Sequence, residues 1–131
     1  MSTSFKVLPL LALLLTLPAI VQGQFTVTTN NGTLTITGYD GPGGAVSIPA
    51  AINGLPVTSL GNKAFGSCTN LTNATIPNSI TNIGPGAFYF CTSLTNVTIG
   101  TSVTSIARDM FCYCWSLTGV KIPNGVTNIV W

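Results

Sequence analysis

The sequence predicts a β-rich solenoid in which right-handed coils of constant length stack behind an N-terminal β-hairpin cap. Three observations predict it: a constant spacing of apolar residues, short runs rich in Val, Ile and Thr, and very little charge. Of the 131 residues, 46% are hydrophobic and 5% are charged, and His is absent. Nucleic-acid binding needs clustered Lys and Arg, so we expect no nucleic-acid partner. The charged residues are Lys6, Lys63, Arg108, Lys121, Asp40 and Asp109.

Residues 1–23 have the features of a secretory signal peptide. Lys6 precedes an apolar run from Val7 to Val21, and we expect cleavage before Gln24. The alternative is an uncleaved anchor, but the run is shorter than the roughly 20 apolar residues that span a bilayer and is broken by prolines. The sequence therefore predicts a secreted or cell-surface protein, without a membrane span after cleavage.

Residues 24–45 are predicted to form the β-hairpin cap and a connector. Residues 25–29 and 33–37 alternate between apolar and polar side chains with period two, on either side of Asn30-Asn31-Gly32. Such a turn between alternating runs is a strong hairpin signal. We expect the hairpin to cover the open sheet edge of the first coil.

Residues 46–131 carry the repeat, and the last coil stops before it is complete. No single coil can enclose its apolar side chains, so neighbouring coils must stack to bury them. The first coil is five residues longer, and Asn53-Gly54-Leu55-Pro56 is predicted to form an inserted turn. The residues that recur every 23 positions are Cys68, Cys91 and Cys114; Leu71, Leu94 and Leu117; Ile76, Ile99 and Ile122; Ile83, Ile106 and Ile129; and Phe65, Phe88 and Phe111.

Each coil is predicted to contain one strand of a parallel sheet and a tight turn on the other face. Residues 94–99 alternate, with Val97 and Ile99 inward, as in a half-buried strand. Pro77, Pro123 and Gly100 end the strands. A second extended piece follows, and the Phe of each coil is predicted to lie on a short helical or 3-10 turn.

The repeat resembles the BspA-like leucine-rich-repeat family, whose pattern is L-x-x-V-x-I-P-x-x-V-x-x-I-G-x-x-A-F-x-x-C. Gly100, Ala107 and Met110 depart from it. The resemblance implies an exported leucine-rich-repeat solenoid that binds proteins or cell surfaces as an adhesion module, and it brings no catalytic residues. The matching positions are Leu71, Ile76, Pro77, Ile80, Ile83, Gly84, Ala87, Phe88 and Cys91.

The cysteines allow three interpretations. Cys68, Cys91 and Cys114 recur with the coil, which favours a ladder of buried thiols, because free Cys packs as a small apolar residue. One disulfide bridge is the second possibility in an exported chain. A metal site is the third, and it is poorly supported without His. We expect no metal and no cofactor.

The sequence does not predict an enzyme. Nucleophilic hydrolysis needs a base beside Ser or Cys, and glycoside cleavage needs a pair of carboxylates. Asp40 and Asp109 are the only acidic residues, they lie in separate coils or caps, and both suit a solvated turn.

A polar stripe on the outward side of the strands is the candidate binding face, because solenoids commonly bind partners there. We expect a protein or glycan ligand. Simple solubility is the competing interpretation, since Thr and Asn suit any exposed strand, and ordering of ice or water is a remote one. The candidate residues are Thr72, Asn73, Thr75, Thr95, Asn96, Thr98, Thr118 and Lys121.

The last coil lacks a polar capping unit after Ile129. Two explanations are open: the chain is a fragment of a longer array with only a structural role, or its open edge associates with another copy.

Overall fold

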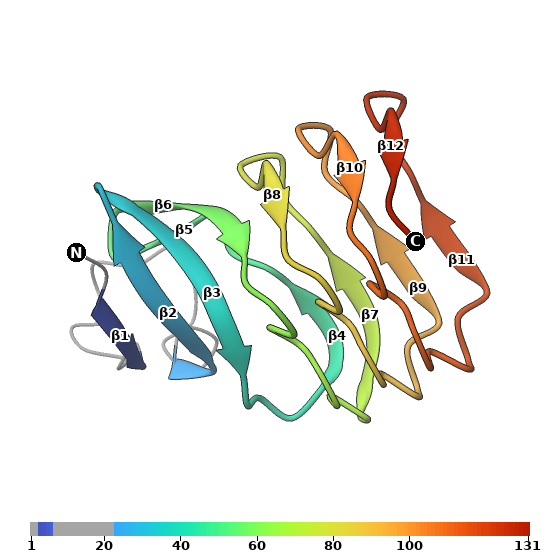
Figure 1. The fold of residues 1–131 in the computed structure, drawn as a ribbon. Helices are drawn as coiled ribbons and strands as arrows, with labels where there is room; N and C mark the ends of the chain where they lie inside the picture. The colour runs from blue at the N-terminus through green and yellow to red at the C-terminus, as the bar shows by residue number, and fades with distance from the viewer. Residues whose placement is uncertain (1–2, 7–22) are drawn as a thin grey trace.

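The computed structural model describes residues 3–6 and 23–131, which form a solenoid of stacked coils (Figure 1). The first row of strands is a parallel four-stranded sheet with the order β11-β9-β7-β4. It forms because each strand turns apolar side chains into the solenoid and polar ones outward, although the buried Leu71 and Ala74 of β7 are three residues apart. The row consists of β4 (Gly44–Ser47), β7 (Leu71–Thr75), β9 (Asn96–Thr98) and β11 (Gly119–Lys121).

A second row of strands lies beside the first in Figure 1. It pairs in parallel between β6 and β8 and between β10 and β12. Leu60 pairs with Ile83 and Ile106 pairs with Ile129, so the predicted repeat interval is the stacking interval. The row consists of β6 (Leu55–Leu60), β8 (Asn82–Ile83), β10 (Ser105–Ile106) and β12 (Asn128–Ile129).

The additional residues of the first coil form a small hairpin. The strand β5 (Ala51–Ile52) pairs antiparallel with β6. Asn53 and Gly54 connect them with φ angles of 49° and 80°, which suits a two-residue hairpin turn. The predicted inserted turn is therefore confirmed at Asn53 and Gly54, whereas Leu55 and Pro56 belong to β6. The insertion leaves Val46 paired with Ala74 of the next coil.

The predicted N-terminal hairpin is present as the antiparallel pair β2 (Phe25–Asn30) and β3 (Thr33–Tyr39). It extends the second row, because β3 pairs in parallel with β6. The expected cover over the first row is absent from the described pairings: β4 is the end strand of its sheet. The physical reason is position along the coil, since β3 stands where the second-row strand of a preceding coil would stand.

The predicted signal peptide lies outside the described residues except for β1 (Thr3–Lys6) and Gly23. The backbone of β1 pairs antiparallel with β2. Cleavage before Gln24 stays a prediction.

The turn expected on the other face takes the form of successive β-turns. The amide of Gly66 donates to the carbonyl of Lys63 at 2.8 Å, and that of Tyr89 to the carbonyl of Gly86 at the same distance. Lys63, Gly86 and Asp109 have φ angles of 53°, 63° and 56°, and a left-handed residue interrupts a helix.

The turns of successive coils are also bonded to each other. The amide of Phe65 donates to the carbonyl of Ala87 at 2.8 Å, and the amide of Phe88 donates to that of Met110 at 3.0 Å. The coils are thus held together by backbone hydrogen bonds on the turn side as well as in the two rows.

The core is one continuous cluster that the hairpin shares with the coils. Leu71 and Leu94 are fully buried inside the first row. An aromatic column crosses the molecule: ring centroids are 5.3 Å apart between Tyr39 and Phe65, 5.1 Å between Phe65 and Phe88, and 5.9 Å between Phe88 and Phe111. Stacked pairs of this kind stabilise a core beyond their buried area.

Candidate functional site

The outward side of the first row carries mainly small polar side chains. Register places Thr75 opposite Thr98, and Thr98 opposite Lys121. Ser47 continues this row on β4, since it pairs with Thr75. All four side chains are exposed, so the structure brings three of the predicted binding residues into one line.

Beside this line, on the same strands of the first row, lie the predicted residues Asn73 and Asn96, which pair with each other and are exposed. Gly119 follows Asn96 in register. A Cβ atom on Gly119 would lie 2.6 Å from the Asn96 side-chain oxygen, so the glycine leaves space for that amide. At the other end of this line, Ala45 of β4 pairs with Asn73. The line therefore has two polar side chains at its centre and a small residue, Ala45 or Gly119, at each end.

Two of the predicted residues near the start of the strands, Thr95 and Thr118, form hydrogen bonds with backbone carbonyls of the preceding coil. The Thr95 hydroxyl donates to the Thr72 carbonyl at 3.0 Å, and the Thr118 hydroxyl donates to the Thr95 carbonyl at 3.3 Å. Each such bond contributes about 1 kcal/mol to folding. Thr95 and Thr118 thus have a structural role that the sequence pattern did not reveal. The better candidates for contact with a partner are Thr75, Thr98 and Lys121.

A cavity of about 510 Å³ lies where β9 and β11 end. Thr98 and Lys121 line it, together with the turn residues Thr101, Pro123 and Asn124. The predicted face therefore continues into a concave end.

Gly100 explains the one missing proline of the repeat. It is buried, and a Cβ atom there would collide with the backbone carbonyl of Pro77 in the preceding coil. Only glycine allows the two turns to approach this closely.

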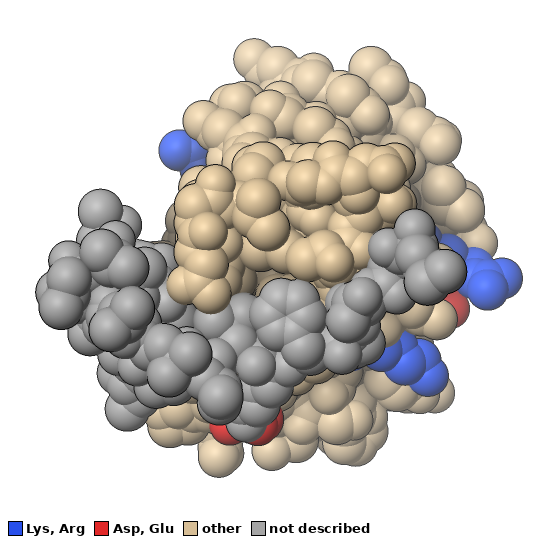
Figure 2. Space-filling view, turned by 90° about the vertical axis from the view of Figure 1, so that its left-hand side faces the viewer, with Lys and Arg blue, Asp and Glu red and all other residues tan. Residues whose placement is uncertain are grey.

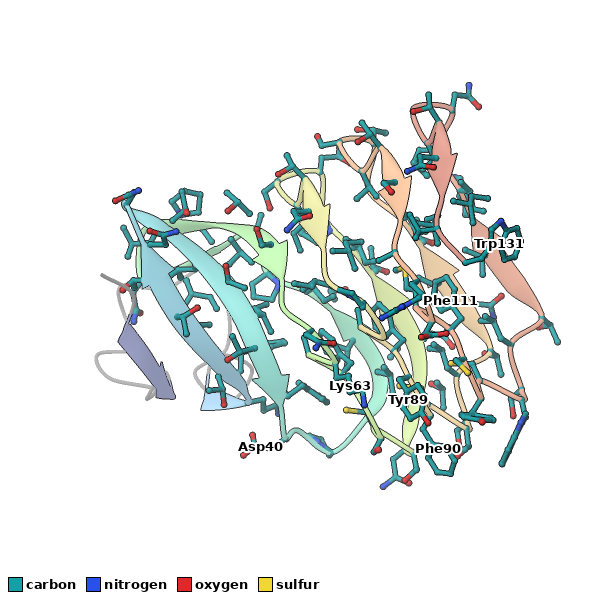
Figure 3. The ribbon with its side chains drawn as sticks, in the orientation of Figure 1. Asp40, Lys63, Tyr89, Phe90, Phe111 and Trp131 are labelled. Atoms are coloured by element: carbon teal, nitrogen blue, oxygen red, sulfur yellow. The ribbon has the colours of Figure 1, made fainter. Side chains whose placement is uncertain are left out.

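A cluster of aromatic side chains at the turns was not predicted. We call Tyr89, Phe90, Tyr113 and Trp115 the aromatic corner; Tyr89 and Phe90 are labelled in Figure 3. Ring centroids are 5.6 Å apart between Phe90 and Trp115, 6.0 Å between Phe90 and Tyr113, and 5.4 Å between Tyr89 and Tyr113. Trp115 is 71% exposed and Tyr113 is 47% exposed.

Two members of the aromatic corner adopt an unfavourable backbone conformation. Phe90 and Tyr113 have φ angles of 58° and 62°, at the position where the preceding coil has Ser67. A bulky side chain in the left-handed region costs on the order of 1–3 kcal/mol. A sequence signal did exist, since Phe90 and Tyr113 stand one repeat apart, but their proximity to Tyr89 and Trp115 depends on how the turns stack.

Charged side chains gather beside the aromatic corner. A cavity of about 290 Å³ is lined by Lys63, Tyr89, Arg108 and Asp109, among others. The Lys63 ammonium lies 4.8 Å from the centre of the Tyr89 ring, and Arg108 Nε lies 3.6 Å from a carboxylate oxygen of Asp109. Partial burial and nearby Tyr113 raise the pKa of Tyr89. Elsewhere charge is sparse: Figure 2 shows a mainly uncharged surface, with a few Lys, Arg and Asp near its outline.

The cysteines are free thiols, and two of them repeat one hydrogen bond. The Cys91 thiol donates to the Phe65 carbonyl and the Cys114 thiol to the Phe88 carbonyl, each at 3.0 Å. The neighbouring Cys114 thiol, followed by burial, raises the pKa of Cys91, and the neighbouring Cys91 thiol lowers the pKa of Cys114. Burial alone raises the pKa of Cys68. This arrangement is that of the predicted thiol ladder.

The described part of the chain, residues 3–6 and 23–131, contains no group of three or more potential metal ligands. It also contains no helix of the length and apolar character needed to cross a membrane.

Comparison with known proteins agrees with the fold. The family model for the BspA type leucine rich repeat region matches residues 47–130. No curated protein matches the chain.

Solved structures of bacterial leucine-rich-repeat proteins superpose on the chain. The protein from T. pallidum has a TM-score of 0.77 and 33% identity over 81% of this chain, which spans 50% of that protein. A protein from Bacteroides capillosus has a TM-score of 0.75 and 36% identity, with 82% and 84% covered. A leucine rich cell surface protein from Faecalibacterium prausnitzii has a TM-score of 0.53 and 29% identity, with 82% and 43% covered.

The constant repeat register, the stacked rows and these matches lead to one conclusion: the chain belongs to the BspA-type leucine-rich-repeat family.

Proposed function

We propose that the protein is a non-catalytic binding module that acts outside the cytoplasm, and that its first-row sheet face contacts a protein partner. The observation that carries this proposal is the continuous outward line of Ser47, Thr75, Thr98 and Lys121. A line of small polar side chains with a single charge suits a protein partner, because desolvating it costs little.

Export is supported by the predicted signal peptide. It is also supported by the family and by the neighbour from F. prausnitzii, which is described as a cell surface protein. Adhesion at a surface is the form of binding that fits an exported solenoid with a long open face.

The test is a binding measurement with the labelled chain on intact cells. Thr75→Glu combined with Thr98→Glu places two carboxylates side by side at the centre of the face, and we expect affinity to fall by at least about tenfold, or ~1.4 kcal/mol. The matched control is Thr104→Glu with Thr127→Glu, because both threonines are exposed at the second row. Equal binding by the two double variants would remove the sheet face from the proposal.

A further inference from the structure

We propose that the aromatic corner, Tyr89, Phe90, Tyr113 and Trp115, is a second binding surface, which takes a protein segment carrying apolar side chains next to a carboxylate. This surface is separate from the sheet face, so either one can bind without the other.

The first support is conformational. Phe90 and Tyr113 occupy left-handed backbone positions with φ angles of 58° and 62°, where Gly or Asn is ordinarily found. Strained positions of this kind cluster at ligand-binding sites, because there function keeps a residue that folding disfavours. The strain here is borne twice, in successive coils, by two aromatic residues that contact each other.

The second support is exposure combined with order. Trp115 is 71% exposed and Tyr113 is 47% exposed. Both rings are nevertheless held by aromatic neighbours, at 5.6 Å from Phe90 for Trp115 and 6.0 Å for Tyr113. Rings that are already fixed lose little side-chain entropy on binding, and Trp and Tyr are the residues most often found to dominate binding at interfaces.

Ring geometry favours a protein over a glycan or a nucleic acid. Most neighbouring rings meet at steep angles: 68° between Phe90 and Trp115, 72° between Tyr113 and Trp115, and 84° between Tyr89 and Tyr113. The exception is the pair Tyr89 and Phe90, whose planes are inclined by 30°. Sugars and bases stack on flat, open ring faces. Here ring edges meet ring faces, which gives a contoured surface whose recesses suit apolar side chains.

Charge specifies the remaining feature of the partner. The cavity that Tyr89 shares with Lys63 and Arg108 holds two cations and one carboxylate, that of Asp109. Arg108 is the group near Asp109, whereas Lys63 lies over the Tyr89 ring. The local balance is positive, so an Asp or Glu of the partner is the complementary group.

The experiment selects random dodecapeptides displayed on phage against the full chain and measures the affinity of the selected peptides. We expect sequences that combine aromatic or aliphatic residues with Asp or Glu. We expect their affinity to fall by at least about tenfold for Phe90→Asn combined with Tyr113→Asn. Asn tolerates the left-handed conformation, so the unfolding temperature of this variant should be unchanged or higher. Lys63→Gln with Arg108→Gln should weaken binding most at low salt.

The control is Thr75→Glu with Thr98→Glu, which alters the sheet face and should leave peptide binding intact. Three outcomes overturn the proposal: no peptide is selected, the selected peptides bind the double Asn variant equally well, or the chain binds glycans through the aromatic corner in place of peptides. A lower unfolding temperature with unchanged binding would assign the rings a purely structural role.

Discussion

Single residues decide how closely the coils approach each other, and Gly100 is the clearest case. Its neighbour across the stack is the backbone of Pro77, which cannot move aside as a flexible side chain could. The departure from the family pattern at this position therefore follows from contact between two turns.

Gly100→Ala should lower the free energy of unfolding by about 1–3 kcal/mol, because the added methyl group forces the turns apart. Gly125→Ala is the matched control, since its added Cβ atom would lie 3.4 Å from the Thr101 carbonyl oxygen, an ordinary contact. Chemical denaturation of both variants measures the difference. Equal stability would mean that the turns near Gly100 can separate at no cost.

The backbone conformation of some residues could be predicted from the sequence, and that of others could not. The hairpin turn at Asn31-Gly32 was predictable because these residue types favour positive φ angles. The left-handed position of Phe90 was not, because the equivalent residues Ser67 and Tyr113 give no sign of that conformation either. The structural role of Thr95 depends on the Thr72 carbonyl in the preceding coil, and the residue type alone does not reveal that contact.

At the scale of elements, the aromatic column joins the N-terminal hairpin to the coils. Tyr39 from β3 stacks on Phe65, and the column continues through Phe88 to Phe111. The period predicted three of these rings. The contribution of Tyr39 was not predictable, because it lies outside the repeat.

Position within the column should set the cost of removing a ring. Phe88 is fully buried between two aromatic neighbours, whereas Phe111 is only half-buried at the end. Phe88→Ala should cost about 3–5 kcal/mol, and Phe111→Ala roughly half as much. Thermal and chemical unfolding of the two variants provide the comparison. A larger loss for Phe111→Ala would contradict the order of burial.

At the scale of the whole molecule, stacking was predictable and the lateral surface was not. The constant repeat interval determined which side chains lie above one another, since each repeat can bury its apolar residues only against the next. It did not reveal the aromatic corner, because Tyr89 and Trp115 have no aromatic counterpart in the neighbouring coils.

The buried thiols make the stability of the whole solenoid dependent on pH. The neighbouring Cys114 thiol and burial raise the pKa of Cys91, so the folded pair should keep one proton where two unfolded thiols lose both. This stabilisation is present below the unfolded pKa of about 8.5 and is lost progressively as the pH rises above it. Urea denaturation from about pH 7 to about pH 10, on either side of that pKa, measures the slope, and Cys91→Ala should reduce it. A slope unchanged in that variant would locate the titration elsewhere.

The β5–β6 hairpin shows that this architecture tolerates added length at one place without disturbing its neighbours. Its turn at Asn53-Gly54 is exposed, while Val46 and Leu60 on either side of it remain in step with the following coil. The same loop is consequently a permissive graft point: a foreign epitope or a reporter peptide introduced there would be displayed outside the stack, and the remaining repeats would fold as before.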